Sequence, residues 1–299
     1  MEKEISKSKM KMALFRHFSC SETMLTLLDR MGGTEWQEVE EASDPLCAGI
    51  LFDLDAACGI LWGGSLSAGI MAQRSFLDPI AAKNAALRAT RKLFDEYNQQ
   101  EDRVNCGERI NMRKWNFLLY MLKGNSFRCQ NNIAGWAPRF REIIDSSMRE
   151  SVEDRPSDNQ QNCACMAMDK VGQAIGLDTT QYAAVPAGLA GGLGLSGSTC
   201  GALAAAIFTQ CLKYFHSRTK SRHGMVRSIL QGFYFGIPWL NPSMNLNEEF
   251  KQKLGTKSCK GITNKVFSNN AEVSGFLRDG GCSGVIDRLA ELAVKYQAA

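Results

Sequence analysis

Residues 188–212 read GLAGGLGLSGSTCGALAAAIFTQCL, a glycine-rich loop followed by a run of helix-forming residues. They end a longer segment, Thr179–Leu212, that contains no charged side chain. A membrane-spanning helix needs about 20 predominantly apolar residues, and the best helical part here, Cys200–Leu212, is shorter than that. The pattern therefore predicts a buried loop that leads into a central helix, and no membrane span.

The rest of the chain shows helical periodicity. Apolar residues after Cys163 recur at about 3.6 residues and stop at Gly176, a residue type that often ends helices. Residues 81–98 are rich in Ala, Leu, Lys and Arg, which favour helices. The last segment carries one apolar face, and no run of alternating β-branched residues occurs. The predicted fold class is all-α, with two tandem helical repeats joined by Gly-rich loops.

The composition narrows the class of protein. With 299 residues, 44% of them hydrophobic, the chain can form one large domain or two smaller ones with proper cores. A net charge of +4 is too small to indicate nucleic acid or an anionic membrane as a partner. The chain has 11 cysteines, an odd number, and its charged start does not resemble a secretory signal. We therefore expect a cytoplasmic protein whose cysteines serve packing, metal binding or redox chemistry.

Eight of the cysteines form two matching sets of four. In the first half the successive separations are 38, 48 and 23 residues, and in the second half they are 37, 59 and 23. The first set is Cys20, Cys58, Cys106 and Cys129, and the second is Cys163, Cys200, Cys259 and Cys282. Agreement in two of three intervals predicts a tandem duplication, with an insertion between Cys200 and Cys259.

Residues around these cysteines match as well. Gly33 and Gly176 each follow the first cysteine of a set by 13 residues, and Gly49 and Gly191 each precede the second by nine. The polar segment 147–162 is predicted to be a linker, and 1–12 a frayed tail. The expected units are residues 13–150, a degenerate first repeat with four Cys, and residues 157–299, a second repeat with the full four-Cys signature.

Seven of the eight cysteines fall near the predicted start of a helix, as Cys163 does directly after the capping residue Asn162. Cys129 is included if its helix begins near Gln130, and Cys58 is the exception, with only Asp55 as a possible cap. A helix N-terminus offers free N–H groups and partial positive charge, which stabilise a thiolate. We therefore expect lowered thiol pKa values and metal-ligating or redox-active cysteines. The other three, Cys47, Cys165 and Cys211, are predicted to be core residues.

The second half resembles a known family. It carries Asn162-Cys163-Ala164, then Gly188–Gly194, Thr199-Cys200-Gly201-Ala202, and single cysteines at 259 and 282. This pattern resembles the family of redox-active proteins named for its C…GCAxxG…C…C signature, which is related to the split-Soret cytochromes. Ala205 stands where the signature has its closing Gly. The first half keeps CGxxxG through Gly63, but Phe52 occupies the position assigned to Gly194, so its loop appears degenerate.

The resemblance implies a redox role with iron–sulfur ligation as a candidate, either as an electron carrier or as an oxidoreductase. Covalent haem is excluded because no C-x-x-C-H occurs. Structural zinc sites use closely spaced cysteine pairs, which are absent here, whereas Cys₄ ligation of a 2Fe–2S or 4Fe–4S cluster fits four separate helix starts. The second set would hold the primary ligands and the first set the secondary ones.

The loop before Cys200 has a further expected role. Four glycines would let backbone N–H groups approach cluster sulfurs: Gly191, Gly192, Gly194 and Gly201. Gly192, Gly194 and Gly197 also spell G-x-G-x-x-G. We reject a dinucleotide site, because no strand precedes it and no acidic residue occurs between Asp178 and Glu248.

Other functions remain open at this stage. A metal-free thiol–disulfide redox protein is one alternative, and a helical scaffold with packing cysteines is another. The inserted segment carries basic residues and then GFYFGIPWLNP at 232–242. Two interpretations are open, a solvated basic turn followed by a loop docked on the core, and a docking surface for an acidic redox partner protein. The sequence also leaves a homodimer open. It identifies no catalytic residue.

Overall fold

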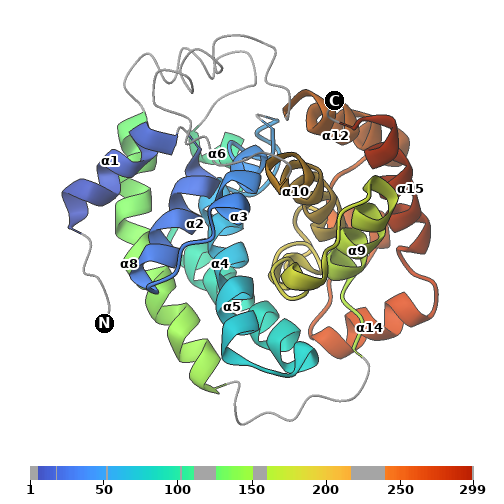
Figure 1. Ribbon diagram of the computed structural model, residues 1–299, viewed down its shortest axis with the longest axis horizontal. Coiled ribbons are helices and arrows are strands. Elements are labelled where there is room, and N and C mark those ends of the chain that lie inside the picture. Colours follow the sequence, from blue (N-terminus) through green and yellow to red (C-terminus); the bar gives the residue numbers. More distant parts are fainter. Residues whose placement is uncertain are drawn as a thin grey trace.

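The computed structural model describes residues 6–17, 19–51, 53–101, 103–110, 126–150, 160–216 and 240–297. Within these residues the regular structure is helical, with two isolated β-bridges and no strand. The all-α prediction is therefore confirmed. Helices of the first half lie on one side of the molecule and those of the second half on the other (Figure 1).

The four segments predicted to be helical, 81–98, 163–176, 200–212 and the last segment, each lie largely within a helix. The first half contains α1 (Lys7–His17), α2 (Cys20–Met31), α3 (Gln37–Ala42), η1 (Asp44–Leu46), α4 (Gly59–Ser75), α5 (Pro79–Glu101), α6 (Cys106–Ile110) and α8 (Ser126–Glu150). The second half contains α9 (Cys163–Ile175), η3 (Thr180–Tyr182), η4 (Ala187–Leu189), α10 (Gly201–His216), α12 (Leu240–Leu254), α13 (Cys259–Thr263), α14 (Asn270–Arg278) and α15 (Ser283–Lys295). No helix in these ranges combines the length and apolarity needed to cross a membrane.

Two boundary predictions were wrong. Much of the expected N-terminal tail belongs to α1, where Met10 is only 4% exposed and joins the core. The expected linker begins too early, since α8 continues to Glu150 and buries Ser147 and Met148. Both segments are mainly polar, so the few residues that face the core do not stand out in the sequence. In the structure α1 packs against α8.

The two halves repeat the same path. Helices α2 and α9 each begin at the first cysteine of a set, and both are followed by a left-handed glycine, Gly33 and Gly176, with φ of +70°. One short element follows, α3 in the first half and η3 in the second. After it come a 3₁₀ turn, η1 or η4, and a loop that leads to α4 or α10. The predicted duplication is therefore visible in the backbone.

The sequence analysis aligned Gly49 with Gly191, and hydrogen bonds in this loop shift that alignment by one residue. Leu51 N–H donates to Pro45 O at 2.8 Å, as Gly194 N–H does to Gly188 O at 2.8 Å. Likewise Leu54 N–H donates to Ala48 O and Gly197 N–H to Gly191 O. Ala48, not Gly49, is therefore the counterpart of Gly191, and Leu51 is the counterpart of Gly194. The first half has one additional residue between Leu54 and Cys58.

The loop of the first half has kept its shape with only one of its glycines, Gly49. Left-handed φ values occur at 48, 49, 50, 51 and 54, and again at their counterparts 191, 192, 193, 194 and 197. Left-handed backbone costs about 1–2 kcal/mol at a residue other than glycine. Ile50, Leu51 and Leu54 are at most 3% exposed, and burial of their side chains offsets this cost. The loop of the first half has therefore lost most of its glycines, as expected, but it has kept its backbone conformation.

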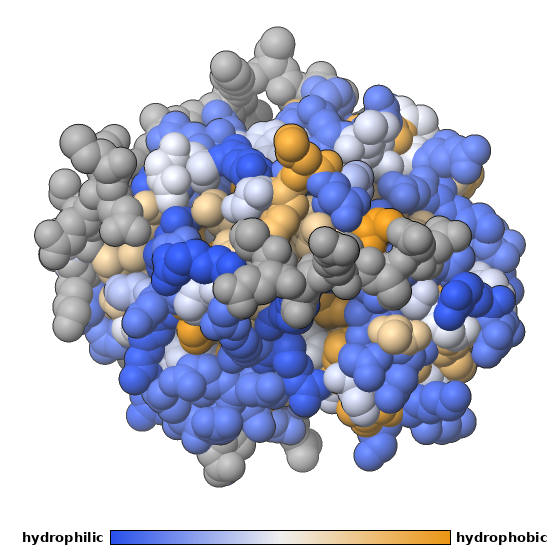
Figure 2. Space-filling view, turned by 90° about the horizontal axis from the view of Figure 1, so that it is seen from below, coloured by the Kyte–Doolittle hydropathy of each residue, from blue (hydrophilic) through white to orange (hydrophobic). Residues whose placement is uncertain are grey.

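Each half packs its loop against the other half. Turn η4 lies on α4 and α5, and turn η1 lies on α10. One hydrophobic core runs through both halves and includes Trp62, Phe140 and Phe208. The outer face in Figure 2 is mostly hydrophilic, with hydrophobic residues gathered toward its middle. The two repeats thus form one continuous body around a shared core.

Candidate cysteine sites

The same short backbone pairing brings together the second and third cysteines of each set. Ala57 and Asn105 form an antiparallel bridge, as do Thr199 and Ser258, and each of these residues directly precedes a cysteine. Cys58 N–H donates to Val104 O at 2.9 Å, and Cys200 N–H donates to Lys257 O at 2.7 Å. The equivalent bonds from Cys106 to Ala56 and from Cys259 to Ser198 complete each pairing. Cysteines far apart in sequence are thereby fixed side by side.

In the second half all four cysteines converge. Cys163, Cys259 and Cys282 pack in one hydrophobic cluster. Burial raises the pKa of the Cys200 thiol, and the neighbouring thiols of Cys163, Cys259 and Cys282 raise it further. We call these four residues the second site.

The four cysteines of the first half converge in the same way. Burial raises the pKa of the Cys106 thiol, and the neighbouring Cys58, Cys20 and Cys129 raise it further. Cys20 shows the same two influences, from burial and then from Cys58 and Cys129. We call these four residues the first site. The structure therefore brings each predicted set together, including the first set.

All eight cysteines lie at helix starts. Cys20, Cys106, Cys163 and Cys259 are the first residues of their helices, and Cys58 and Cys200 directly precede theirs. Cys282 is the N-cap of α15 with a left-handed φ of 62°. Cys129 is the fourth residue of α8, which begins at Ser126 rather than near Gln130. The prediction from capping residues extends even to Cys58, which occupies the N-cap position of α4.

The expected lowering of thiol pKa values was wrong. Burial raises the pKa of Cys163, Cys200, Cys259 and Cys282, with values of about 12 for the last two. The partial charge at a helix start cannot offset the loss of water around a buried thiolate. Without a cation, these thiols are neutral at pH 7. A cation would have to displace their protons in order to bind.

The loops supply N–H groups to the sulfurs. Hydrogen bonds from the backbone N–H of Gly191 and Ala164 lower the pKa of Cys163 against the larger effect of burial. In the first site the backbone N–H of Ala48 does the same for Cys20. Ala48 and Gly191 are counterparts, so this contact is repeated.

The predicted glycines divide into two groups. A Cβ on Gly192 would lie 2.7 Å from Cys259 Cβ, so Gly192, like Gly191, borders the second site. A Cβ on Gly194 would meet Arg91 of α5 at 2.8 Å, and one on Gly201 would meet Leu189 O at 1.9 Å. Gly194 and Gly201 therefore serve close packing of the backbone.

The spacing of the thiols bears on which group they could hold. Among the described residues, no three His, Cys, Asp or Glu side chains are grouped closely enough to bind one metal ion. A single zinc ion needs its sulfurs about 2.3 Å from one point. A cluster of several irons takes its four cysteines at separate corners. The thiols of each site therefore converge without forming a single-ion site among the described residues.

Sequence reasoning missed several residues at the sites. Cys165 and Cys211 are buried core residues, as expected, but Cys47 packs with Cys106 and Cys20 at the first site. Its counterpart is Ala190, which borders the second site. Only the corrected alignment shows this relationship, so the spacing of cysteines could not have revealed it.

A buried ion pair links the two halves beside the sites. Asp53, in the first-half loop, pairs with Lys257, whose carbonyl accepts the Cys200 N–H. Their side chains are 8% and 5% exposed. Asn247 Nδ2 donates to Asp53 at 3.5 Å, and Lys251 lies 3.7 Å from it. Burial lowers the pKa of Lys257, and Asp53 counteracts that effect.

The two sites are linked through the residues that precede their second cysteines. Ala57 N–H donates to Thr199 Oγ1 at 3.4 Å, and these residues precede Cys58 and Cys200. Because Ala57 and Thr199 are counterparts, the contact lies where the two repeats face each other. The first and second sites are therefore neighbours.

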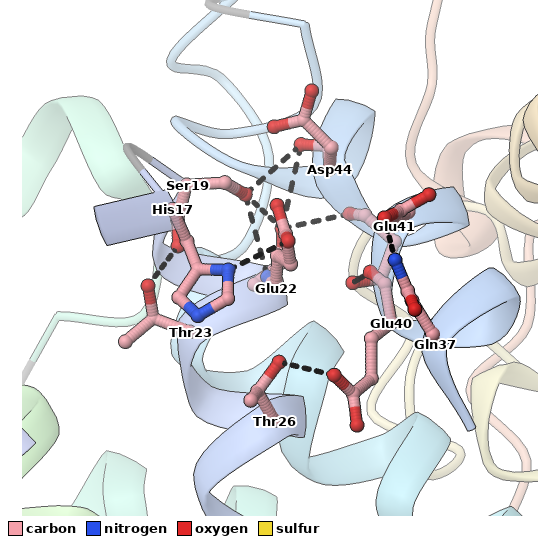
Figure 3. Close-up of polar contacts among 11 residues, drawn as sticks. His17, Ser19, Glu22, Thr23, Thr26, Gln37, Glu40, Glu41 and Asp44 are labelled. Atoms are coloured by element: carbon pink, nitrogen blue, oxygen red, sulfur yellow. Dashed lines mark hydrogen bonds and ion pairs between the residues drawn. The ribbon is translucent and has the colours of Figure 1, made fainter. Parts of the chain in front are cut away.

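A group of carboxyl side chains lies beside the start of α2 (Figure 3). His17 Nδ1 and Glu22 Oε1 are 2.7 Å apart, and Thr26 Oγ1 donates to Glu40 Oε2 at 3.0 Å. Further along α2, Asp29 is fully buried and accepts a hydrogen bond from Ser67 at 3.4 Å. Burial and the nearby Glu40 raise the pKa of Asp29 to about 8.

Replacing Asp29 with asparagine is expected to flatten the pH dependence of stability. Because the folded pKa of about 8 lies above the unfolded value of about 3.9, this carboxyl's contribution is complete below pH ~4 and is lost as pH rises toward 8. Asp29→Asn removes that loss, so at pH 8 the variant should be more stable than wild type by several kcal/mol, on the order of 5. Urea unfolding at pH 5 and pH 8 measures it.

The control for this experiment is Asp287→Asn, at a half-exposed carboxylate paired with Lys170 on the surface. This change should leave the difference between pH 5 and pH 8 as in wild type. If the Asp29 variant shows the wild-type difference as well, Asp29 does not hold a proton in the folded protein.

Fold and sites together define a class, a tandemly duplicated all-α protein with four converging cysteines in each repeat. The model of the family described as "Putative redox-active protein (C_GCAxxG_C_C)" matches residues 18–143 and again residues 161–296. This chain belongs to that family and is a duplicated member of it. No match was found among curated proteins or solved structures.

The predicted docking surface lies mostly outside the described residues, which omit 217–239. Of its basic residues, Lys213 donates to Gly176 O at 2.7 Å. His216 Nδ1 lies 3.0 Å from Glu38 Oε2. These two side chains therefore join elements within the fold.

Proposed function

We propose that this chain is an electron-transfer protein that binds an iron–sulfur cluster, 2Fe–2S or 4Fe–4S, at each of its two sites. The ligands of the second site would be Cys163, Cys200, Cys259 and Cys282, and those of the first Cys20, Cys58, Cys106 and Cys129. A bound cluster would accept and release electrons one at a time. A partner protein would supply or receive them.

The repeated bridge carries this proposal. Both halves use the same pair of backbone hydrogen bonds to hold the second and third cysteines together, although the connecting segments differ in length. Packing alone does not require a fixed thiol geometry, because a buried cysteine behaves as a small hydrophobic residue. Preservation of four converging thiols in both halves supports a ligand role.

The surroundings of the thiols favour a cluster over metal-free chemistry. Attack on a disulfide requires a thiolate, and burial raises the pKa of most of these thiols. The structure records no disulfide among the described cysteines. Iron would supply the positive charge that makes ionisation of the thiols favourable.

Anaerobic reconstitution with ferrous iron and sulfide tests the proposal. The wild-type chain should turn brown and bind iron and sulfide in comparable amounts. Cys200→Ala should lower both contents by about half, because it removes a ligand of one site. Cys211→Ala, a matched change at a buried cysteine outside both sites, should keep the full content. A colourless wild-type protein without iron would overturn the proposal.

A further inference from the structure

The two sites differ at three positions that the repeat makes equivalent. Cys47 in the first half corresponds to Ala190, as established by the loop hydrogen bonds. Tyr97 and Phe250 each precede the third cysteine by nine residues and are fully buried in α5 and α12. Arg109 and Ile262 each follow that cysteine by three. At each position the first site has a polar or reactive side chain and the second has an apolar one.

Cys47 lies beside the ligands of the first site. Its N–H donates to Asp44 O at 3.1 Å, and Ala190 N–H donates to Ala187 O at 3.3 Å, so the backbone is held alike in both halves. Cys47 is 4% exposed and packs with Cys106 and Cys20. Ala190 packs with Cys163 and Cys259. The same position in the repeat therefore carries a sulfur atom beside the first site and a methyl group beside the second.

Cys20 is the ligand that faces Cys47 most directly. The position of a Cβ on Gly59 would lie 2.2 Å from Cys20 Sγ and 3.2 Å from the Cα of Cys47. Both residues therefore meet the same face of α4 at its first residue. Cys20 is also more exposed than Cys47. A small shift at this end of α2 would exchange one sulfur for the other.

An independent feature points to a ligand at the first site. The Tyr97 hydroxyl is buried and makes a hydrogen bond with the Cys58 side chain, with no oxygen or nitrogen partner among the described residues. The Arg109 guanidinium lies over its ring, 4.9 Å from the centroid, and pairs with Glu101 at 2.8 Å. A thiol is a weak hydrogen-bond partner for a buried hydroxyl, whereas a thiolate bound to a cluster would be a stronger acceptor. Sulfur atoms of a bound cluster could accept its hydrogen bond.

We propose that the first site is a five-thiol site in which Cys47 can replace Cys20 as a cluster ligand, whereas the second site has only four thiols. The inference rests on the proposed function, since it requires a bound cluster. In the exchange one iron–thiolate bond breaks and another forms. The proton leaving Cys47 passes to the released Cys20 sulfur, and no electron is transferred.

Removal of equivalent ligands tests this proposal in the full-length chain. After anaerobic reconstitution with ferrous iron and sulfide, Cys163→Ala should lose about half of the wild-type iron, because its site has no spare thiol. Cys20→Ala should keep nearly all of it. The double variant Cys20→Ala/Cys47→Ala should lose about half, and Cys47→Ala alone should lose none. Circular dichroism of each variant shows whether it folds.

A spectroscopic comparison adds a second measurement. In Cys20→Ala/Cys47→Ser, oxygen would replace sulfur as the fourth ligand, and the visible absorption bands should shift relative to Cys20→Ala. Cys47→Ser alone should leave the wild-type spectrum unchanged. Equal iron loss in Cys20→Ala and Cys163→Ala, or equal iron content in Cys20→Ala and its double variant, would overturn the exchange. A wild-type chain that binds no iron would instead overturn the proposed function itself.

Discussion

Replacing Lys257 with methionine is expected to lower the free energy of unfolding by about 3–5 kcal/mol. The change leaves the Asp53 carboxylate, whose side chain is only 8% exposed, without its closest cation. A buried charge that loses its partner keeps its desolvation cost and loses the compensating attraction. Because Asp53 lies in the first half and Lys257 in the second, the loss should weaken the contact between repeats. Urea unfolding of the metal-free protein measures it.

Two further variants separate the ion pair from general packing. Lys251→Met removes a neighbouring cation that is 40% exposed and lies 3.7 Å from Asp53, and it should cost less than about 1 kcal/mol. Asp53→Asn/Lys257→Met removes both buried charges and should recover much of the stability lost in Lys257→Met. Equal destabilisation by Lys257→Met and Lys251→Met would show that the buried pair has no special weight.

Replacing Gly69 with alanine should destabilise the protein by about 3 kcal/mol, at the upper end of the usual cost of overpacking. A Cβ at this position in α4 would lie 2.1 Å from Val185 O and 2.7 Å from Ala184 O. These are backbone atoms of the second half, which cannot move aside as a flexible side chain can. The variant should therefore unfold at a markedly lower temperature.

Gly135→Ala is the matched control for this substitution. Gly135 also lies within a long helix, α8, but a Cβ there would meet nothing within 4 Å. Alanine restricts the unfolded chain and favours the helix, so this change should stabilise the protein by about 0.5–1 kcal/mol. If both glycine variants shift the melting temperature in the same direction, the contact of α4 with Val185 does not limit stability.

Helices and cysteine sets could be predicted because their signals are local or regular. The apolar period after Cys163 and the left-handed glycine at 176 specify α9 without reference to the rest of the chain. Cysteine spacing identified both sets, because the duplication preserved it. The residues bridging the cysteines were not predictable, since a two-residue pairing between distant segments leaves no periodic signal.

The alignment of the loops was wrong for a physical reason. Glycine was taken as the marker of left-handed backbone, so the loss of glycines in the first half was taken as loss of the loop. Ala48, Ile50, Leu51 and Leu54 instead adopt the same left-handed conformation, with most of their side chains inside the core. The preference of non-glycine residues against left-handed backbone can be overridden where the surrounding core holds them in place. Cys47 was expected to have no cysteine counterpart, and the corrected alignment places Ala190 at its position.

The thiol pKa values show a similar competition. Helix starts favour thiolates, and the positions of the cysteines followed that expectation. Depth of burial, which sequence patterns around a single cysteine do not reveal, outweighs this effect at Cys200 and Cys106. The sequence therefore predicted where the thiols lie but not their protonation state.

The hydrogen bond from Ala57 to Thr199 joins a residue to its own counterpart. Such a contact arises at a twofold axis, as in an isologous interface between identical subunits. Two separate copies of one repeat, meeting in this way, would have identical sites, and every mutation would alter both together. Within a single chain each site can be mutated alone. Covalent linkage of the repeats is thus what permits Cys47 to face one site while Ala190 faces the other.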